Sequence, residues 1–192
     1  MLGLATSIVL GVLGTLMLVP VRSAAGPVPV AAGADPTTTV DLPDDRLARS
    51  RPRLAALLDG TRIVVPRLQI DLPLLVGDSD RDVATQSTPT GAAFLLPGSA
   101  LPGTTGNSYV YAHARPGMFL SLWNVGLGDQ IEIVAPSGAI LSYTVSEIDP
   151  RVAVSDLMYL LPTDDDRLTL QTSTGPRVSD PRFVVVARRS GP

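Results

Sequence analysis

The sequence predicts an all-β domain, a closed or nearly closed barrel with short helical turns, that follows an N-terminal apolar segment. Glycine and proline number 17 and 18 among 192 residues while aromatic residues make up 4%, so short elements joined by many turns are expected. From Arg62 onward, apolar side chains recur at every second position in six to eight short runs bounded by turn residues. Such a series of strands is typical of a small barrel.

The N-terminal segment, residues 1–21, contains no charged side chain and is long enough to span a bilayer as a helix. A signal peptide has a shorter apolar core and a basic start. We therefore predict a transmembrane anchor, with a signal segment cleaved within residues 22–27 as the open alternative. Residues 22–45, rich in Pro and Ala, predict a disordered stalk. Residues 46–192 then form one domain of ordinary size.

Residues 44–60 predict a short helix with Asp44 or Asp45 as its cap, Gly60 as its end and Pro52 as a point where it can break. Its buried side would be formed by Leu54, Leu57 and Leu58.

The later runs predict strands, two of them within 62–77, followed by 107–114, 130–136, 140–148, 167–173 and 182–189. Helical turns are expected within 117–129 and 154–162, because apolar residues recur there at helical spacing.

Composition excludes several classes of function. The net charge is −3 and no long basic run occurs, so nucleic acid is not expected as a partner. The absence of cysteine excludes disulfides, zinc-thiolate sites and a thiol nucleophile. No phosphate-binding glycine loop appears, and no cofactor or metal is expected. The acidic segment 78–82 lacks the glycine and glutamate of a calcium loop, so we interpret it as a solvated turn.

A Gly/Pro-rich loop separates the runs 167–173 and 182–188, which predicts a hairpin with Ser173 opposite Arg182. Directly paired residues have Cβ atoms about 4.5–5.5 Å apart, so the guanidinium can serve an oxyanion or a peptide carbonyl beside the hydroxyl. The alternative is a turn serine and a surface arginine. His113 is the only histidine, and so the only side chain whose ordinary pKa lets it act as a base near neutral pH. The alternative is that this histidine, at the end of a strand, is a surface residue without a catalytic role.

Taken together, five segments resemble the sortase family, the transpeptidases and hydrolases on the outer face of Gram-positive-type bacterial membranes. "RIVVPRLQIDLPLLVG" resembles the family's opening strands, "GNSYVYAHAR" its strand ending in the catalytic histidine, and "FLSLWNVGLGDQIEI" its F-x-x-L…G-D-x-I element. "LTLQTS" is similar to the T-L-x-T-C motif, and "RFVVVA" to the strand that opens with the catalytic arginine.

This resemblance implies a closed eight-stranded β-barrel behind a single-pass anchor in the bacterial cell membrane, with the domain extracytoplasmic. It implies catalytic roles for His113, Ser173 and Arg182, and a groove, lined by Thr172 and nearby loops, for an extended sorting-signal peptide. The acyl group would pass to an amine of the cell wall or a pilin, or to water. No cofactor is implied.

The departure from the family pattern is Ser173, which stands where the family has cysteine. Transferring a proton from a thiol to imidazole costs roughly 2 pKa units, or about 2.7 kcal/mol. For an alcohol the cost is on the order of 9 units, or about 12 kcal/mol, so a preformed ion pair is not available. A serine would need a general base oriented by a carboxylate. Candidate carboxylates are Asp129, Asp149, Asp156 and Asp180.

Two hypotheses follow, with a deliberate replacement of the cysteine as a third explanation. The chain is a serine-variant sortase-like transferase or hydrolase, or it is an inactive homologue that binds peptide or serves as a cell-surface scaffold. Because His113 and Arg182 are both present beside Ser173, the first is favoured.

Overall fold

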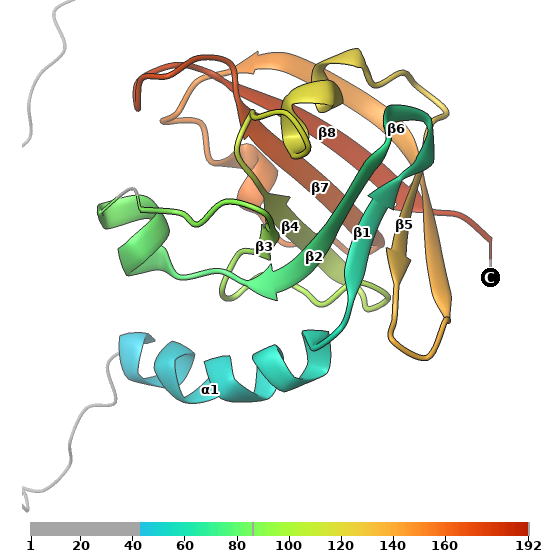
Figure 1. Cartoon of the computed structure of the whole chain (residues 1–192). Helices are drawn as coiled ribbons and strands as arrows, with labels where there is room; N and C mark the ends of the chain where they lie inside the picture. The colour runs from blue at the N-terminus through green and yellow to red at the C-terminus, as the bar shows by residue number, and fades with distance from the viewer. Residues whose placement is uncertain (1–42, 86, 192) are drawn as a thin grey trace, which may run out of the picture. The chain divides into compact units, whose positions relative to one another are not determined.

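Eight strands close into a barrel in the computed structural model, which describes residues 43–85 and 87–191 (Figure 1). Around the barrel the order is β1-β2-β3-β4-β7-β8-β6-β5, and β5 pairs with β1 to close it. The strands are β1 Arg62–Val65, β2 Ile70–Val76, β3 Ala93–Leu95, β4 Gly106–Tyr111, β5 Gln130–Val134, β6 Ile140–Val152, β7 Asp166–Ser173 and β8 Arg182–Arg189. The predicted all-β, eight-stranded barrel is confirmed.

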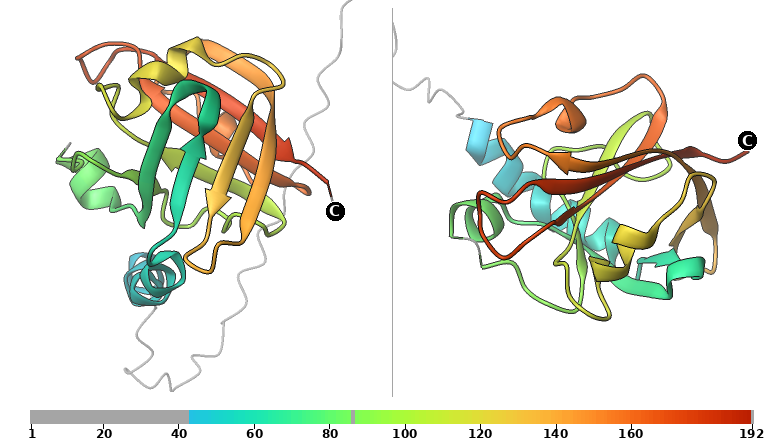
Figure 2. Two further views of the ribbon diagram at one scale, coloured as in Figure 1. Left: turned by 45° about the vertical axis from the view of Figure 1, so that its right-hand side comes forward. Right: turned by 90° about the horizontal axis from the view of Figure 1, so that it is seen from above.

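One longer helix precedes the barrel. Helix α1, Pro43–Leu58, begins one residue before the predicted cap and continues through Pro52, so the expected break is wrong. Pro52 is exposed to solvent, and the helix continues past it although proline lacks the backbone N–H of a helical hydrogen bond. Leu58 is buried, but Leu57 is 65% exposed, because only a narrow face near the end of α1 meets the strands. The views in Figure 2 show α1 lying outside the barrel wall.

Four short helical segments lie in the connections between strands. They are η1 Pro66–Leu68, η2 Asp80–Ala84, η3 Phe119–Asn124 and η4 Met158–Leu160. The last two confirm the predicted helical turns. In η3, Phe119 and Leu122 are fully buried, which explains their helical spacing in the sequence.

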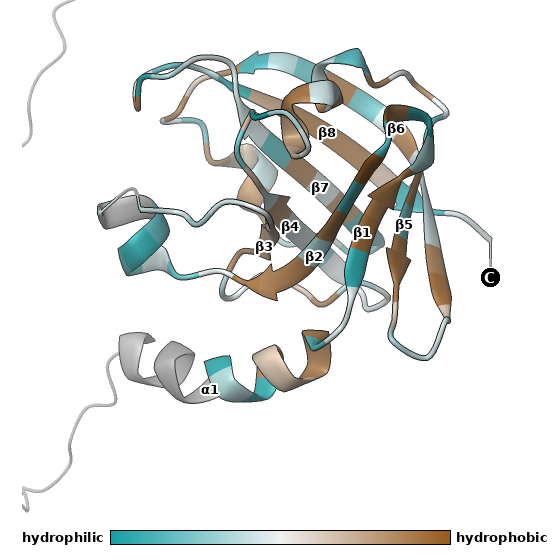
Figure 3. Ribbon diagram, viewed as in Figure 1, coloured by the Kyte–Doolittle hydropathy of each residue, from teal (hydrophilic) through white to brown (hydrophobic). Residues whose placement is uncertain are grey.

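The alternation of apolar and polar residues sets which side chains fill the barrel. Along β7, Leu168, Leu170 and Thr172 are fully buried, while Gln171 and Ser173 are partly exposed on the opposite face. Burial also alternates along β1 and β2, and Figure 3 shows that both strands are mostly apolar. Burying one Leu or Ile side chain stabilises a fold by about 1.5–3 kcal/mol, so this interior is the main stabilising element.

The strand that the sequence did not reveal is β3, which has only three residues and is buried throughout. A run this short shows no alternation. It pairs parallel with β2 and antiparallel with β4. It thereby fixes the position of β4, which ends at Tyr111, two residues before His113.

The predicted anchor, residues 1–21, and residues 22–42 of the predicted stalk lie outside the described residues. Within the described part of the chain, no helix has the length and apolar character needed to cross a membrane.

Candidate active site

Strand pairing brings the three predicted catalytic residues to one end of the barrel. Strands β4 and β7 run parallel with Tyr111 opposite Gln171. Continuing this register by two residues sets His113 level with Ser173. On the other side of β7, Ser173 pairs directly with Arg182 of β8. Three neighbouring strands therefore each deliver one polar residue to the same edge.

These residues line a cleft of about 810 Å³. The walls also carry exposed apolar side chains from η3, from the connection between β6 and β7, and from the β7–β8 loop. They are Trp123, Val154, Leu157, Leu160 and Val178. A few polar groups at the centre of an apolar cleft are typical of a ligand-binding site.

Thr172, predicted to line the groove, has a fully buried side chain. Its hydroxyl donates to the carbonyl of Ala112 at 2.9 Å, which ties β7 to the segment that ends in His113. This side chain therefore braces the site from inside the barrel, and only the backbone of Thr172 is left to meet a substrate.

The partly buried imidazole of His113 contacts a backbone carbonyl. Its Nε2 lies 2.8 Å from the carbonyl oxygen of Thr88, in the loop between β2 and β3. A carbonyl oxygen only accepts hydrogen bonds, so Nε2 carries a proton in this contact.

The four carboxylates considered as orienters of His113 have other partners. Asp129 pairs with Arg67, and Asp149 accepts from the hydroxyl of Tyr159 at 3.3 Å. Asp156 and Asp180 accept backbone amides of their own turns. Among residues 43–85 and 87–191, no carboxylate hydrogen-bonds to His113, and no three His, Asp or Glu side chains converge as metal ligands would.

Arg182 is held by its own loop. Its guanidinium donates to the carbonyls of Asp180 at 2.7 Å and Val178 at 3.2 Å. A guanidinium has five N–H donors, so three are left for a substrate. Burial raises the pKa of nearby Tyr109, another cleft residue, to about 12, although the positive charge of Arg182 opposes that shift.

The acidic segment 78–82 is not the solvated turn expected from the sequence, because the side chain of Asp82 is only 1% exposed. It accepts hydrogen bonds from the hydroxyl of Tyr111 and from Arg81 and the amide of Asp78. Burial by itself raises the pKa of Asp82, but these hydrogen bonds outweigh it and hold the pKa below its ordinary value. Sequence reasoning missed Asp82 because its partner Tyr111 lies 29 residues further along the chain.

The family model for the sortase domain matches residues 63–190 of this chain. The chain belongs to the sortase family. The predicted resemblance is thereby confirmed, and with it the prediction of an enzyme at the level of the family, since sortases are transpeptidases that act on sorting-signal peptides. No curated protein matches the chain in sequence.

Solved sortase structures are similar across the barrel. A lid mutant of sortase A from Corynebacterium diphtheriae is 29% identical, with a TM-score of 0.60 over 77% of this chain and 78% of that one. Sortase C-1 from Actinomyces oris is 27% identical, with a TM-score of 0.57 over 69% and 74%. Sortase A from Listeria monocytogenes, 22% identical with a TM-score of 0.58 over 68% and 86%, shares the fold.

Proposed function

We propose that this sortase-family protein transfers or hydrolyses acyl groups of sorting-signal-type peptides with Ser173 as its nucleophile. The observation that carries the proposal is the strand register. It sets Ser173 between His113 on the parallel neighbour and Arg182 on the antiparallel one, at the edge of an apolar cleft.

In the first half-reaction, Oγ of Ser173 attacks the peptide carbonyl as His113 accepts its proton. The free N–H groups of Arg182 stabilise the oxyanion. The C–N bond then breaks, His113 returns the proton to the leaving amine, and the acyl group stays on Ser173 as an ester. In the second half-reaction an amine or water attacks the ester, and the hydroxyl of Ser173 is restored.

The cleft suits an extended peptide with apolar side chains. Exposed Leu157 and Leu160 on one wall and Val178 on the other supply apolar contacts for such a chain. We further propose that residues 1–21 anchor the protein in the bacterial cell membrane with its domain outside. The acceptor would be an amine of the cell wall or of a pilin subunit.

The alternative, an inactive homologue that binds peptide, is favoured by two contacts. His113 meets a carbonyl where a serine enzyme commonly has a carboxylate. Arg182 already uses two donors within its own loop. Both contacts are compatible with a groove that holds a peptide without cleaving it.

Incubation of the purified chain with a library of sorting-signal peptides, with and without an amine acceptor, distinguishes the two functions. We expect cleavage by the native chain and none by Ser173→Ala. If the native chain cleaves nothing and Ser173→Cys gains activity, the protein is a peptide-binding scaffold that lacks only its thiol.

A further inference from the structure

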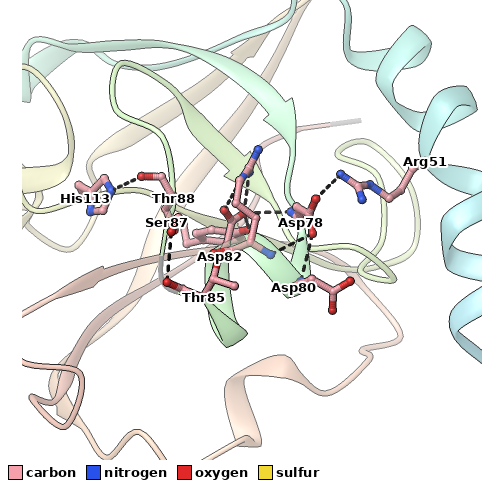
Figure 4. Close-up of polar contacts among 10 residues, drawn as sticks. Arg51, Asp78, Asp80, Asp82, Thr85, Ser87, Thr88 and His113 are labelled. Carbon is pink, nitrogen blue, oxygen red and sulfur yellow. Dashed lines mark hydrogen bonds and ion pairs between the residues drawn. The ribbon is translucent and has the colours of Figure 1, made fainter.

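We propose that the backbone carbonyl of Thr88 orients His113 in place of a carboxylate, and that Asp82 is the positioning residue that holds the loop presenting this carbonyl. The inference rests on the proposed role of His113 as the base. The loop concerned lies between β2 and β3 and is described over residues 77–85 and 87–92. Figure 4 shows Thr88 of this loop beside His113.

The first step concerns the tautomer of the imidazole. Because the carbonyl of Thr88 can only accept, the neutral ring of His113 carries its proton on Nε2 and leaves the lone pair on Nδ1. Nδ1 is then the atom that takes the proton from Ser173. A histidine whose tautomer is fixed by the partner of its other nitrogen is a recurring feature of catalytic sites.

The second step concerns what fixes the carbonyl. Thr88 precedes Pro89, and a residue before proline is restricted to extended conformations. Upstream, the amide of Ser87 donates to the carbonyl of Arg81 at 2.8 Å, and the hydroxyl of Thr85 donates to the same carbonyl at 2.8 Å. These hydrogen bonds connect Ser87, the residue before Thr88, to Arg81, the neighbour of Asp82.

The third step concerns the anchor of the loop. Oδ2 of Asp82 accepts from Arg81 at 2.8 Å, from the amide of Asp78 at 2.9 Å, and from the hydroxyl of Tyr111. Tyr111 lies on β4, two residues before His113, so the carboxylate fixes the loop to the same strand that carries the base. Buried, charge-assisted hydrogen bonds of this kind are strong and hold a single geometry.

A second contact fixes the start of the loop. Asp78 accepts the amides of Asp80 and Arg81 and pairs with Arg51 of α1 at 2.8 Å. A Cβ on Gly77 would lie 2.2 Å from the hydroxyl of Tyr111, so only glycine allows that hydroxyl to approach the backbone and reach Asp82.

A neutral carbonyl and a carboxylate differ in the charge that they place beside the imidazole. It orients the ring but contributes no full negative charge to stabilise the imidazolium that forms during attack. The position of the carbonyl must therefore be kept by the loop, which makes Asp82 a determinant of kcat more than of KM.

The test uses the fact that His113 is the only histidine, so the imidazole ¹⁵N–¹H correlation spectrum of the full chain reports on this ring alone. We expect the Nε2–H tautomer in the native chain. In Asp82→Asn we expect a mixture of tautomers and a kcat reduced about tenfold with KM little changed. The matched control is Asp71→Asn, which alters an exposed aspartate paired with Arg62 and should change neither quantity.

Tyr111→Phe removes one hydrogen bond to Asp82 and keeps the ring, so it gives the same shifts in weaker form if Asp82→Asn does not fold. A native Nδ1–H tautomer, or an unchanged tautomer and kcat in both variants, would overturn the inference. A chain that cleaves no peptide, yet shows the Nε2–H tautomer and loses it in Asp82→Asn, contradicts the proposed function and supports the positioning.

Discussion

Two loops flank the cleft, and each is organised by one aspartate and one glycine. In the β2–β3 loop, buried Asp82 accepts three donors, and the hydroxyl of Tyr111 packs over Gly77. In the β7–β8 loop, Asp180 is partly exposed, accepts the amide of Arg177, and packs over Gly175.

The difference between the loops is burial. Charged hydrogen bonds inside the protein are shielded from water and keep one geometry, whereas exposed ones exchange with solvent at little cost. We therefore expect the loop beside His113 to keep its position before a substrate binds, and the loop beside Arg182 to adjust more readily on binding. A serine nucleophile requires a base that is already oriented when the attack begins, which is why the fixed loop should be the one beside His113.

The largest effects should come from removing the reacting group on either side of the cleft. Ser173→Ala and His113→Ala should each lower kcat/KM by on the order of a thousandfold or more, and the double variant should be little worse, because the two groups act as a unit. Hydrolysis of a fluorogenic peptide measures this. Substantial activity in Ser173→Ala would remove the serine from the mechanism.

Arg182→Ala should lower kcat by about a hundredfold, because it removes the donors proposed for the oxyanion. Arg188→Ala is the matched control on the same strand, since Arg188 is exposed and pairs with Asp165 away from the cleft. Steady-state kinetics of both variants distinguish a loss of oxyanion stabilisation from a general effect of removing an arginine from β8. Equal losses in both would show that the effect is one of folding.

Substituting the two aspartates should destabilise the protein to different extents, because only Asp82 is buried. Asp82→Asn should reduce the free energy of unfolding by about 2 kcal/mol, because a buried charged acceptor of several hydrogen bonds is lost. Asp180→Asn should cost less than about 0.5 kcal/mol, as is usual for surface changes. Urea denaturation with an unchanged m-value measures both. Similar losses of unfolding free energy in the two variants would mean that burial does not distinguish the two loops.

A smaller effect follows from the lowered pKa of Asp82. The folded pKa lies below the unfolded value of about 3.9, so the stabilisation is complete above that pH and is lost as the pH falls through the folded pKa. The stability difference between the native chain and Asp82→Asn should therefore be constant at pH 5–7 and shrink below about pH 4. A difference that grows in acid would contradict this sign.

The barrel was predictable because its signal is local. Alternation along segments such as 167–173 and 182–188 gave both the strands and the pairing of Ser173 with Arg182. The three-residue strand β3 was missed because it is too short to alternate, and Leu57 was misplaced because only a narrow face of α1 meets the barrel.

The surroundings of His113 were not predictable from the sequence. Its partner is the backbone carbonyl of Thr88, and every residue has a carbonyl, so no residue type marks it. Asp82, in η2, accepts a hydrogen bond from Tyr111 of β4, which is distant in the sequence. The sequence thus predicted the groups that we propose to react, but not the groups that we propose to position them.

The account depends most on whether Ser173 carries the acyl group. Intact-mass analysis of the chain, quenched soon after it is mixed with a cleavable sorting-signal peptide, tests this directly. We expect an adduct equal to the N-terminal peptide fragment bound as an ester, mapped to Ser173 and absent in Ser173→Ala. No adduct on the native chain, with a thioester formed by Ser173→Cys under the same conditions, would contradict it.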